Sequence, residues 1–161
     1  MRRIPLFLAL AAIVPAAGVT AQDHPDFSGT WKINLIKSDA PPGRGGQQMD
    51  MSRLTLTITQ TAEALTIVQT GMGPERSLTY YLDGRESTNT AQRGEMKSTS
   101  RWDGDKLVTD GSATMETPNG PRTITTSEVR SLSKDGKTMT VSTTSDSPMG
   151  TRTRKMVFER Q

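Results

Sequence analysis

Apolar side chains alternate with threonine or serine along most of the chain beyond residue 26. The clearest runs are residues 53–59, Arg-Leu-Thr-Leu-Thr-Ile-Thr, and residues 137–142, Lys-Thr-Met-Thr-Val-Ser. Successive side chains of a strand point to opposite faces, so this pattern gives each strand one buried face and one wet face. No window shows the i, i+3, i+4, i+7 apolar spacing of a helix. The sequence therefore predicts an all-β protein with almost no helix.

The turns between these runs differ in length in a regular way. We expect ten strands, near residues 27–34, 53–59, 64–70, 76–82, 85–90, 95–102, 105–116, 122–132, 137–145 and 151–159. Consecutive turns of an antiparallel meander alternate between its two ends. Short turns fall at one end, at residues 60–63, Asp83-Gly84, Asp103-Gly104 and Asp135-Gly136, and longer Gly/Pro-rich turns at the other, at residues 71–75, 91–94, 117–121 and 147–150. This order predicts an up-and-down antiparallel meander barrel of 8–10 strands with a tight end and an open end.

The longest connection, residues 35–52, joins the first two expected strands at the open end. Its residues 39–46 read Asp-Ala-Pro-Pro-Gly-Arg-Gly-Gly, and prolines and glycines of this density exclude a regular strand. We therefore predict a mobile loop over the open end. Long structureless connections are either functional or disordered, and the sequence leaves both interpretations open.

The first 21 residues have the pattern of a secretory signal peptide. Arg2 and Arg3 precede an apolar run, residues 4–14, and the small-residue segment ends in Val19-Thr20-Ala21. The run is shorter than the roughly 18–20 residues that span a bilayer. We predict cleavage after Ala21, a single domain of residues 22–161, and a periplasmic or secreted protein without a membrane anchor.

Charge and cysteine content narrow the choice of partners. Loss of Arg2 and Arg3 lowers the formal charge from +3 to +1, so basicity does not favour a nucleic-acid partner. The chain has no cysteine, which excludes disulfides and lipidation at a cysteine. We expect a monomer whose barrel is held by packing and hydrogen bonds.

Residues 27–32, Phe-Ser-Gly-Thr-Trp-Lys, resemble the Gly-x-Trp motif on the first strand of lipocalins and fatty-acid-binding proteins, the calycin group. The chain also resembles short exported bacterial proteins that begin in this way. The resemblance implies that Trp31 plugs the barrel floor, that Gly29 admits a close backbone, and that an arginine of the last strand covers the tryptophan. Arg160 is the better candidate for this arginine, and Arg154 is the second.

Strand number and the long first connection resemble the fatty-acid-binding type more than the eight-stranded lipocalins. That type carries an Arg-x-Tyr pair on its last strand for the ligand carboxylate, whereas here Arg154 is followed by Lys155 and Met156. The helical lid of that type has no counterpart in the sequence.

Several polar and aromatic side chains fall in phase with an inward face. Tyr80 and Trp102 either line a cavity or belong to ordinary core packing. Glu128 and Arg130 share a face, so either they pair inside a wet cavity or the opposite face, with Val129, points inward.

Two further arginines, Arg152 and Arg154, are in phase with the inward-facing Met156 and Phe158 of the last strand. Near the mouth they either hold an anionic ligand head or extend to solvent. We include both among the candidate ligand-binding residues, with Tyr80, Trp102 and Arg130.

No motif predicts catalysis or a cofactor. His24 is the only histidine and cysteine is absent, which removes the common catalytic triads and metal sites. One exception depends on processing: a mature terminus Gln22-Asp23-His24 would offer square-planar nitrogen ligands to Cu(II) or Ni(II).

Two functional hypotheses of different classes remain open. A third, an enzyme that uses Glu128, has the least support in the sequence, and we do not adopt it. The first is an exported protein that binds a small apolar or amphipathic molecule in the barrel. The second is a protein-interaction or inhibitor module with a filled barrel, which binds through its open-end loops.

Overall fold

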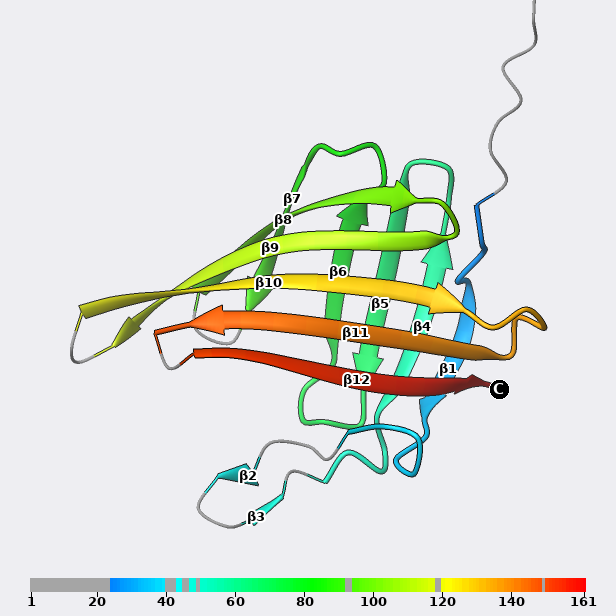
Figure 1. Cartoon of the computed structure of the whole chain (residues 1–161), viewed down its shortest axis with the longest axis horizontal. Helices are drawn as coiled ribbons and strands as arrows, with labels where there is room; N and C mark the ends of the chain where they lie inside the picture. Colours follow the sequence, from blue (N-terminus) through cyan, green and yellow to red (C-terminus); the bar gives the residue numbers. More distant parts are fainter. Residues whose placement is uncertain are drawn as a thin grey trace, which may run out of the picture.

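The computed structural model describes residues 24–39, 43–44, 47–48, 50–91, 94–117, 120–148 and 150–161. Ten antiparallel strands form one sheet in the order β6-β5-β4-β1-β12-β11-β10-β9-β8-β7. They are β1 (Gly29–Ile33), β4 (Thr55–Gln60), β5 (Ala64–Thr70), β6 (Arg76–Tyr81), β7 (Glu86–Ala91), β8 (Gly94–Asp103), β9 (Lys106–Thr117), β10 (Gly120–Leu132), β11 (Thr138–Ser147) and β12 (Gly150–Arg160). In Figure 1 the long strands β8 to β12 cross in front of β4, β5 and β6. The predicted all-β meander is confirmed, and each expected strand is present within a few residues of its predicted ends.

One expectation about the long connection was wrong. β2 (Gly43–Arg44) and β3 (Gln47–Gln48) pair as a short antiparallel ribbon, where we expected no strand. The adjoining residues 40–42, 45–46 and 49 lie outside the described residues. Within the described residues, no helix is long and apolar enough to cross a membrane.

The first and last strands meet in the middle of the sheet. Trp31 lies opposite Arg160 on β12 and opposite Leu56 on β4, so β1 has a ladder on both sides. The indole is fully buried with Phe27, and its Nε1 donates a hydrogen bond of 2.8 Å to the Phe27 carbonyl oxygen. The packed aromatic group closes the tight end of the barrel.

The guanidinium of Arg160 covers Trp31 from outside, 4.3 Å from a ring centroid. Its nitrogens donate to the carbonyl oxygens of Ser28 and, at 2.9 Å, of Gly136. Gly29 has a φ of +124°, and a Cβ there would lie 2.7 Å from Nη1 of Arg160. The backbone conformation therefore favours glycine here, and any side chain would also displace the arginine that lies against it.

The barrel closes at a seam of side chains between β6 and β7, the two edges of the sheet. The Asn89 amide donates to the Thr79 carbonyl oxygen at 2.9 Å and accepts from the Thr79 N–H at 2.8 Å. The Ser87 hydroxyl accepts from the Tyr81 N–H at 2.8 Å. Asn89 and Ser87 are both buried, and their side chains bond to part of the β6 edge where no backbone ladder joins β6 to β7.

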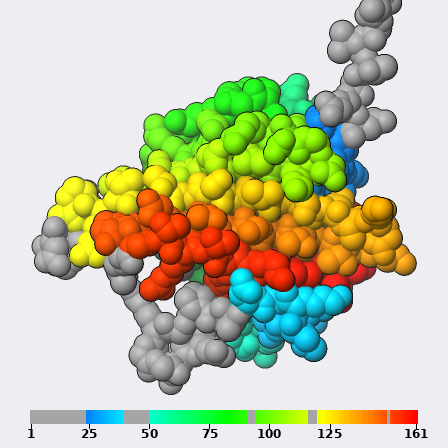
Figure 2. Space-filling view, viewed as in Figure 1, coloured from blue at the N-terminus to red at the C-terminus, as the bar shows by residue number. Residues whose placement is uncertain are grey.

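Beyond β1, residues 34–39 run along the edge of β12 (Figure 2, where they form the cyan surface below the red strand). Asn34 N–H donates to the Val157 carbonyl oxygen at 2.8 Å, and Asp39 N–H donates to that of Lys155 at 2.9 Å. The Ser38 hydroxyl accepts from Val157 N–H at 2.9 Å. This part of the long connection protects the strand edge, and does not lie over the open end as expected.

Arg160→Ala should lower the free energy of unfolding by about 2 kcal/mol, because it removes a cation–π contact and charge-assisted hydrogen bonds. Urea unfolding followed by tryptophan fluorescence measures the loss. Arg152→Ala is the matched control, since Arg152 is an exposed arginine of the same strand. An equal loss in the two variants would contradict the role of Arg160.

Asn89→Ala should cost about 2 kcal/mol of stability, because the half-buried N–H and carbonyl oxygen of Thr79 lose their hydrogen-bond partners. Hydrogen exchange measured by NMR should show a faster Thr79 amide, with the β10–β11 ladder unchanged. Thr88→Ala, at the exposed neighbouring position, is the control. Unchanged exchange at Thr79 in Asn89→Ala would refute the seam as described.

Candidate ligand-binding cavity

A cavity of about 240 Å³ lies inside the barrel toward the open end. Its walls come from β4, β5 and β6 on one side, β10, β11 and β12 on the other, and the turns beside them. Most of the lining is apolar: Met51, Leu54, Leu56, Ile67, Met72, Leu78, Val141, Met156 and Phe158. The polar lining residues are Gln69, Tyr80, Glu128, Arg130 and Arg154.

Strand register brings the charged residues onto this inner face. Arg130 lies opposite Val141, which lies opposite Met156. In the next inward row, Glu128 lies opposite Thr143, which lies opposite Arg154. This register settles the alternative left open by the sequence, because Glu128 and Arg130 both line the cavity.

Arg130 and Glu128 form an ion pair within the cavity. The Arg130 side chain is 5% exposed and that of Glu128 is 26% exposed, so the carboxylate can be reached from the cavity. A buried charge must be paired or solvated, and this pair meets part of that requirement. The Nε of Arg130 has no hydrogen-bond partner among the described residues.

Arg154 provides the second positive charge. Its Nη2 contacts the Met51 sulfur at 3.1 Å, and its buried Nε has no partner in the described part of the chain. None of the carboxylates described there forms an ion pair with it. The cavity thus has one excess positive charge, beside apolar side chains.

Tyr80 lies on the opposite wall and is buried. Burial raises the pKa of Tyr80 to about 12, and the negative charge of Glu128 acts in the same direction. The phenol is therefore neutral near pH 7. It presents a hydroxyl that can donate or accept a hydrogen bond.

Of the five residues expected to bind ligand, the structure brings together Tyr80, Arg130 and Arg154 in this cavity. Trp102 instead belongs to the tight end: its ring stacks on His24, with centroids 4.2 Å apart and planes 3° apart. Arg152 is exposed near the turn before β12 and does not line the cavity. Gln22 and Asp23 lie outside the described residues, so the copper or nickel site stays a prediction.

The lining residues that the sequence analysis did not name include Gln69, Met51 and Met72. Gln69 is in phase with Leu65 and Ile67 on β5, so alternation was a signal that could have identified it. Met51 and Met72 lie in turns, where alternation carries no information about which way a side chain points.

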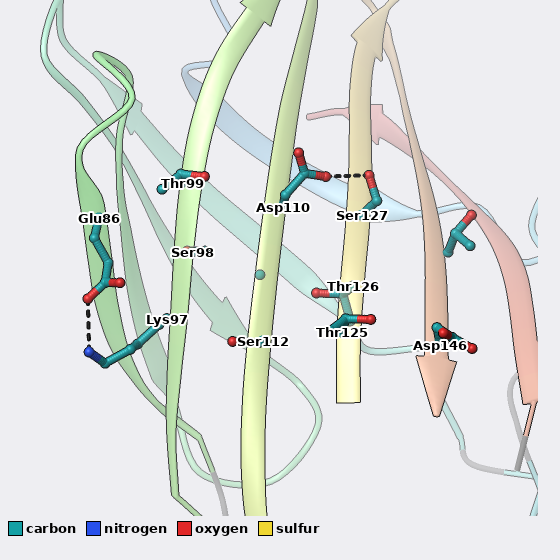
Figure 3. Close-up of a pocket in the computed structure, with 12 residues that line it drawn as sticks. Glu86, Lys97, Ser98, Thr99, Asp110, Ser112, Thr125, Thr126, Ser127 and Asp146 are labelled. Carbon is teal, nitrogen blue, oxygen red and sulfur yellow. Dashed lines mark hydrogen bonds and ion pairs between the residues drawn. The ribbon is translucent and has the colours of Figure 1, made fainter. Parts of the chain in front are cut away.

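A broader hollow of about 550 Å³ lies on the outer face of β7 to β11 (Figure 3). Each of its charged groups has a partner. Lys97 contacts Glu86 at 3.0 Å, the Ser127 hydroxyl donates to Asp110 at 2.6 Å, and the Thr151 hydroxyl donates to Asp146 at 2.9 Å. Hydrogen bonds from Ser127 and Arg101 lower the pKa of Asp110. No group of three or more potential metal ligands occurs among the residues the structure describes. We read this hollow as a solvated sheet surface.

Comparison with solved structures identifies the architecture. Zebrafish ileal bile acid-binding protein, in complex with cholic acid, matches with a TM-score of 0.56 at 16% identity, over 84% of this chain and 98% of that one. The fold is that of the lipocalin-like and fatty-acid-binding barrels. A fatty acid transporter, REP1-NXSQ, matches with a TM-score of 0.56 at 14% identity, over 83% and 95% of the two chains.

A secretory abundant heat soluble protein of Ramazzottius varieornatus also has this fold, with a TM-score of 0.59 at 13% identity over 84% and 95% of the two chains. No protein-family model and no curated protein matches the chain. At these identities the likeness concerns the barrel alone. The chemistry of the cavity is therefore set by its own residues.

The raised pKa of Tyr80 predicts a loss of stability at alkaline pH. Between pH 10 and about 12 the phenol ionises in the unfolded chain but stays neutral in the folded protein, so proton release favours unfolding. Across this window the free energy of unfolding should fall by about 3 kcal/mol on account of Tyr80. Urea unfolding at several pH values, with Tyr80→Phe for comparison, measures it. The same decline in both proteins would contradict the assignment.

Proposed function

We propose that this protein is an exported binding protein, which holds a small amphipathic acid in the cavity with its anionic head against Arg154. The observation that carries the proposal is an apolar cavity with one excess positive charge. A guanidinium binds a carboxylate through charge-assisted hydrogen bonds, and the apolar walls bury the body of the ligand. Arg154 has donors available, since its Nε lacks a partner among the described residues.

The cavity volume bounds the ligand. Cavities for drug-sized ligands measure roughly 300–1,000 Å³, and this one is smaller, at about 240 Å³. The proposed ligand is therefore a short-chain or single-ring acid. A filled barrel, which the interaction-module hypothesis requires, has no such space, so the cavity favours the binding protein.

Two structural neighbours accord with this proposal, since one is a bile acid-binding protein in complex with cholic acid and the other is a fatty acid transporter. Export rests on the signal-like residues 1–21, and a periplasmic or secreted location is part of the proposal. N-terminal sequencing of the protein from its host tests export, since a mature chain that begins at Met1 would refute it.

Octanoate should bind with one-to-one stoichiometry in isothermal titration calorimetry, and Arg154→Met should weaken its affinity about tenfold or more through loss of a charge-assisted contact. Arg152→Met is the matched control, because that arginine lies outside the cavity, and it should bind as the parent does. Failure of hexanoate, octanoate and decanoate alike to bind would refute the proposed function. Equal affinities in the two variants would refute the role of Arg154.

A further inference from the structure

The carboxylate of Glu128 has no role in holding a simple aliphatic acid. It lines the same cavity as Arg154 and carries the same sign of charge as the ligand head. A hydrocarbon body that fills the cavity removes water from this carboxylate, and burial of a charge without full hydrogen bonding is costly. An acid without a further polar group therefore leaves the site incompletely matched.

Glu128 also retains capacity to accept hydrogen bonds. Its Oε1 accepts from Arg130 Nη2, and no other hydrogen bond to this carboxylate is formed within the described residues. Two carboxylate oxygens offer about four acceptor sites in total. At 26% exposure of the side chain, a ligand can reach the remaining sites from inside the cavity.

The charges of the cavity limit the ligand to one negative charge. Arg130 and Glu128 compensate one another, so Arg154 alone has an excess charge to neutralise. The ligand group that contacts Glu128 should therefore be a neutral hydrogen-bond donor. An ammonium group would make the ligand electrically neutral overall, and the excess positive charge of the cavity would remain. Tyr80, a neutral phenol on the facing wall, adds a hydroxyl to the same polar region.

The register places the two recognition points in one row. Glu128 and Arg154 occupy one row across β10, β11 and β12, with Thr143 between them. Two strand spacings separate their backbones by about 10 Å. Both side chains line the same cavity, so an acid with a hydroxyl group on its chain can contact both.

From these features we infer that the ligand is a hydroxylated monocarboxylic acid, with its carboxylate on Arg154 and its hydroxyl donating to Glu128. This inference rests on the proposed function and narrows its ligand class. Glu128 then sets specificity, because it favours hydroxylated acids and disfavours plain aliphatic acids of equal length.

Titration calorimetry of the full mature protein with octanoate and 8-hydroxyoctanoate tests the inference. The parent protein should bind 8-hydroxyoctanoate about tenfold more tightly than octanoate, since a hydrogen bond to a charged group is gained. Glu128→Gln should reduce this ratio, because the amide is a weaker, uncharged acceptor. Glu95→Gln removes an exposed carboxylate outside the cavity and should leave the ratio unchanged.

A double variant, Glu128→Leu with Arg130→Met, removes both members of the ion pair and so avoids an uncompensated buried charge. It should prefer octanoate, and near-UV circular dichroism checks that it is folded. Equal binding of the two acids by the parent protein, or a ratio that Glu128→Gln leaves unchanged, would overturn the inference while the proposed function stood. If neither octanoate nor 8-hydroxyoctanoate bound, both the inference and the proposed function would be overturned.

Discussion

β1 forms hydrogen bonds with β12 at one side and with β4 at the other, and this double pairing turns an open meander into a barrel. It also brings Trp31 beneath Arg160, two residues 129 positions apart, at the point where the ends of the chain meet. The buried indole fills the tight end. The cavity lies beyond this plug, between the inner faces of β4 to β6 and β10 to β12, and reaches Met51 and Met72 at the open end.

The chemistry of that space depends on register more than on composition. Successive inward rows place Arg130 beside Val141 and Met156, and Glu128 in line with Arg154. A slip of one residue in β10 would turn both charges outward and bring Val129 inward. The long ladder between β9 and β10, which extends from the tight end to the open end, resists such a slip.

Alternation and turn length were sufficient to predict the strands, because each strand has one face on the core and the turns carry their own glycine and aspartate signals. The same alternation predicted whether a side chain points into or out of the barrel. It did not predict the position of the side chain between the tight end and the open end. Trp102 is in phase with the cavity face but lies beside the Asp103-Gly104 turn, and Arg152 lies two residues beyond Gly150. That position depends on the stagger between strands, which is a property of the closed sheet.

The cavity and the seam of the barrel share the strand β6. Leu78 and Tyr80 form part of the cavity wall, while the outer edge of the same strand is held by the side chains of Asn89 and Ser87. This seam lacks the repeated backbone bonds of the other strand pairs, so it is the part of the barrel with the least cooperative support. A ligand that packs on Leu78 and Tyr80 adds contacts that exist only when β6 is in place. Its binding free energy therefore stabilises the contacts between β6 and β7. By the same linkage, a substitution that stabilises these contacts raises the affinity for the ligand.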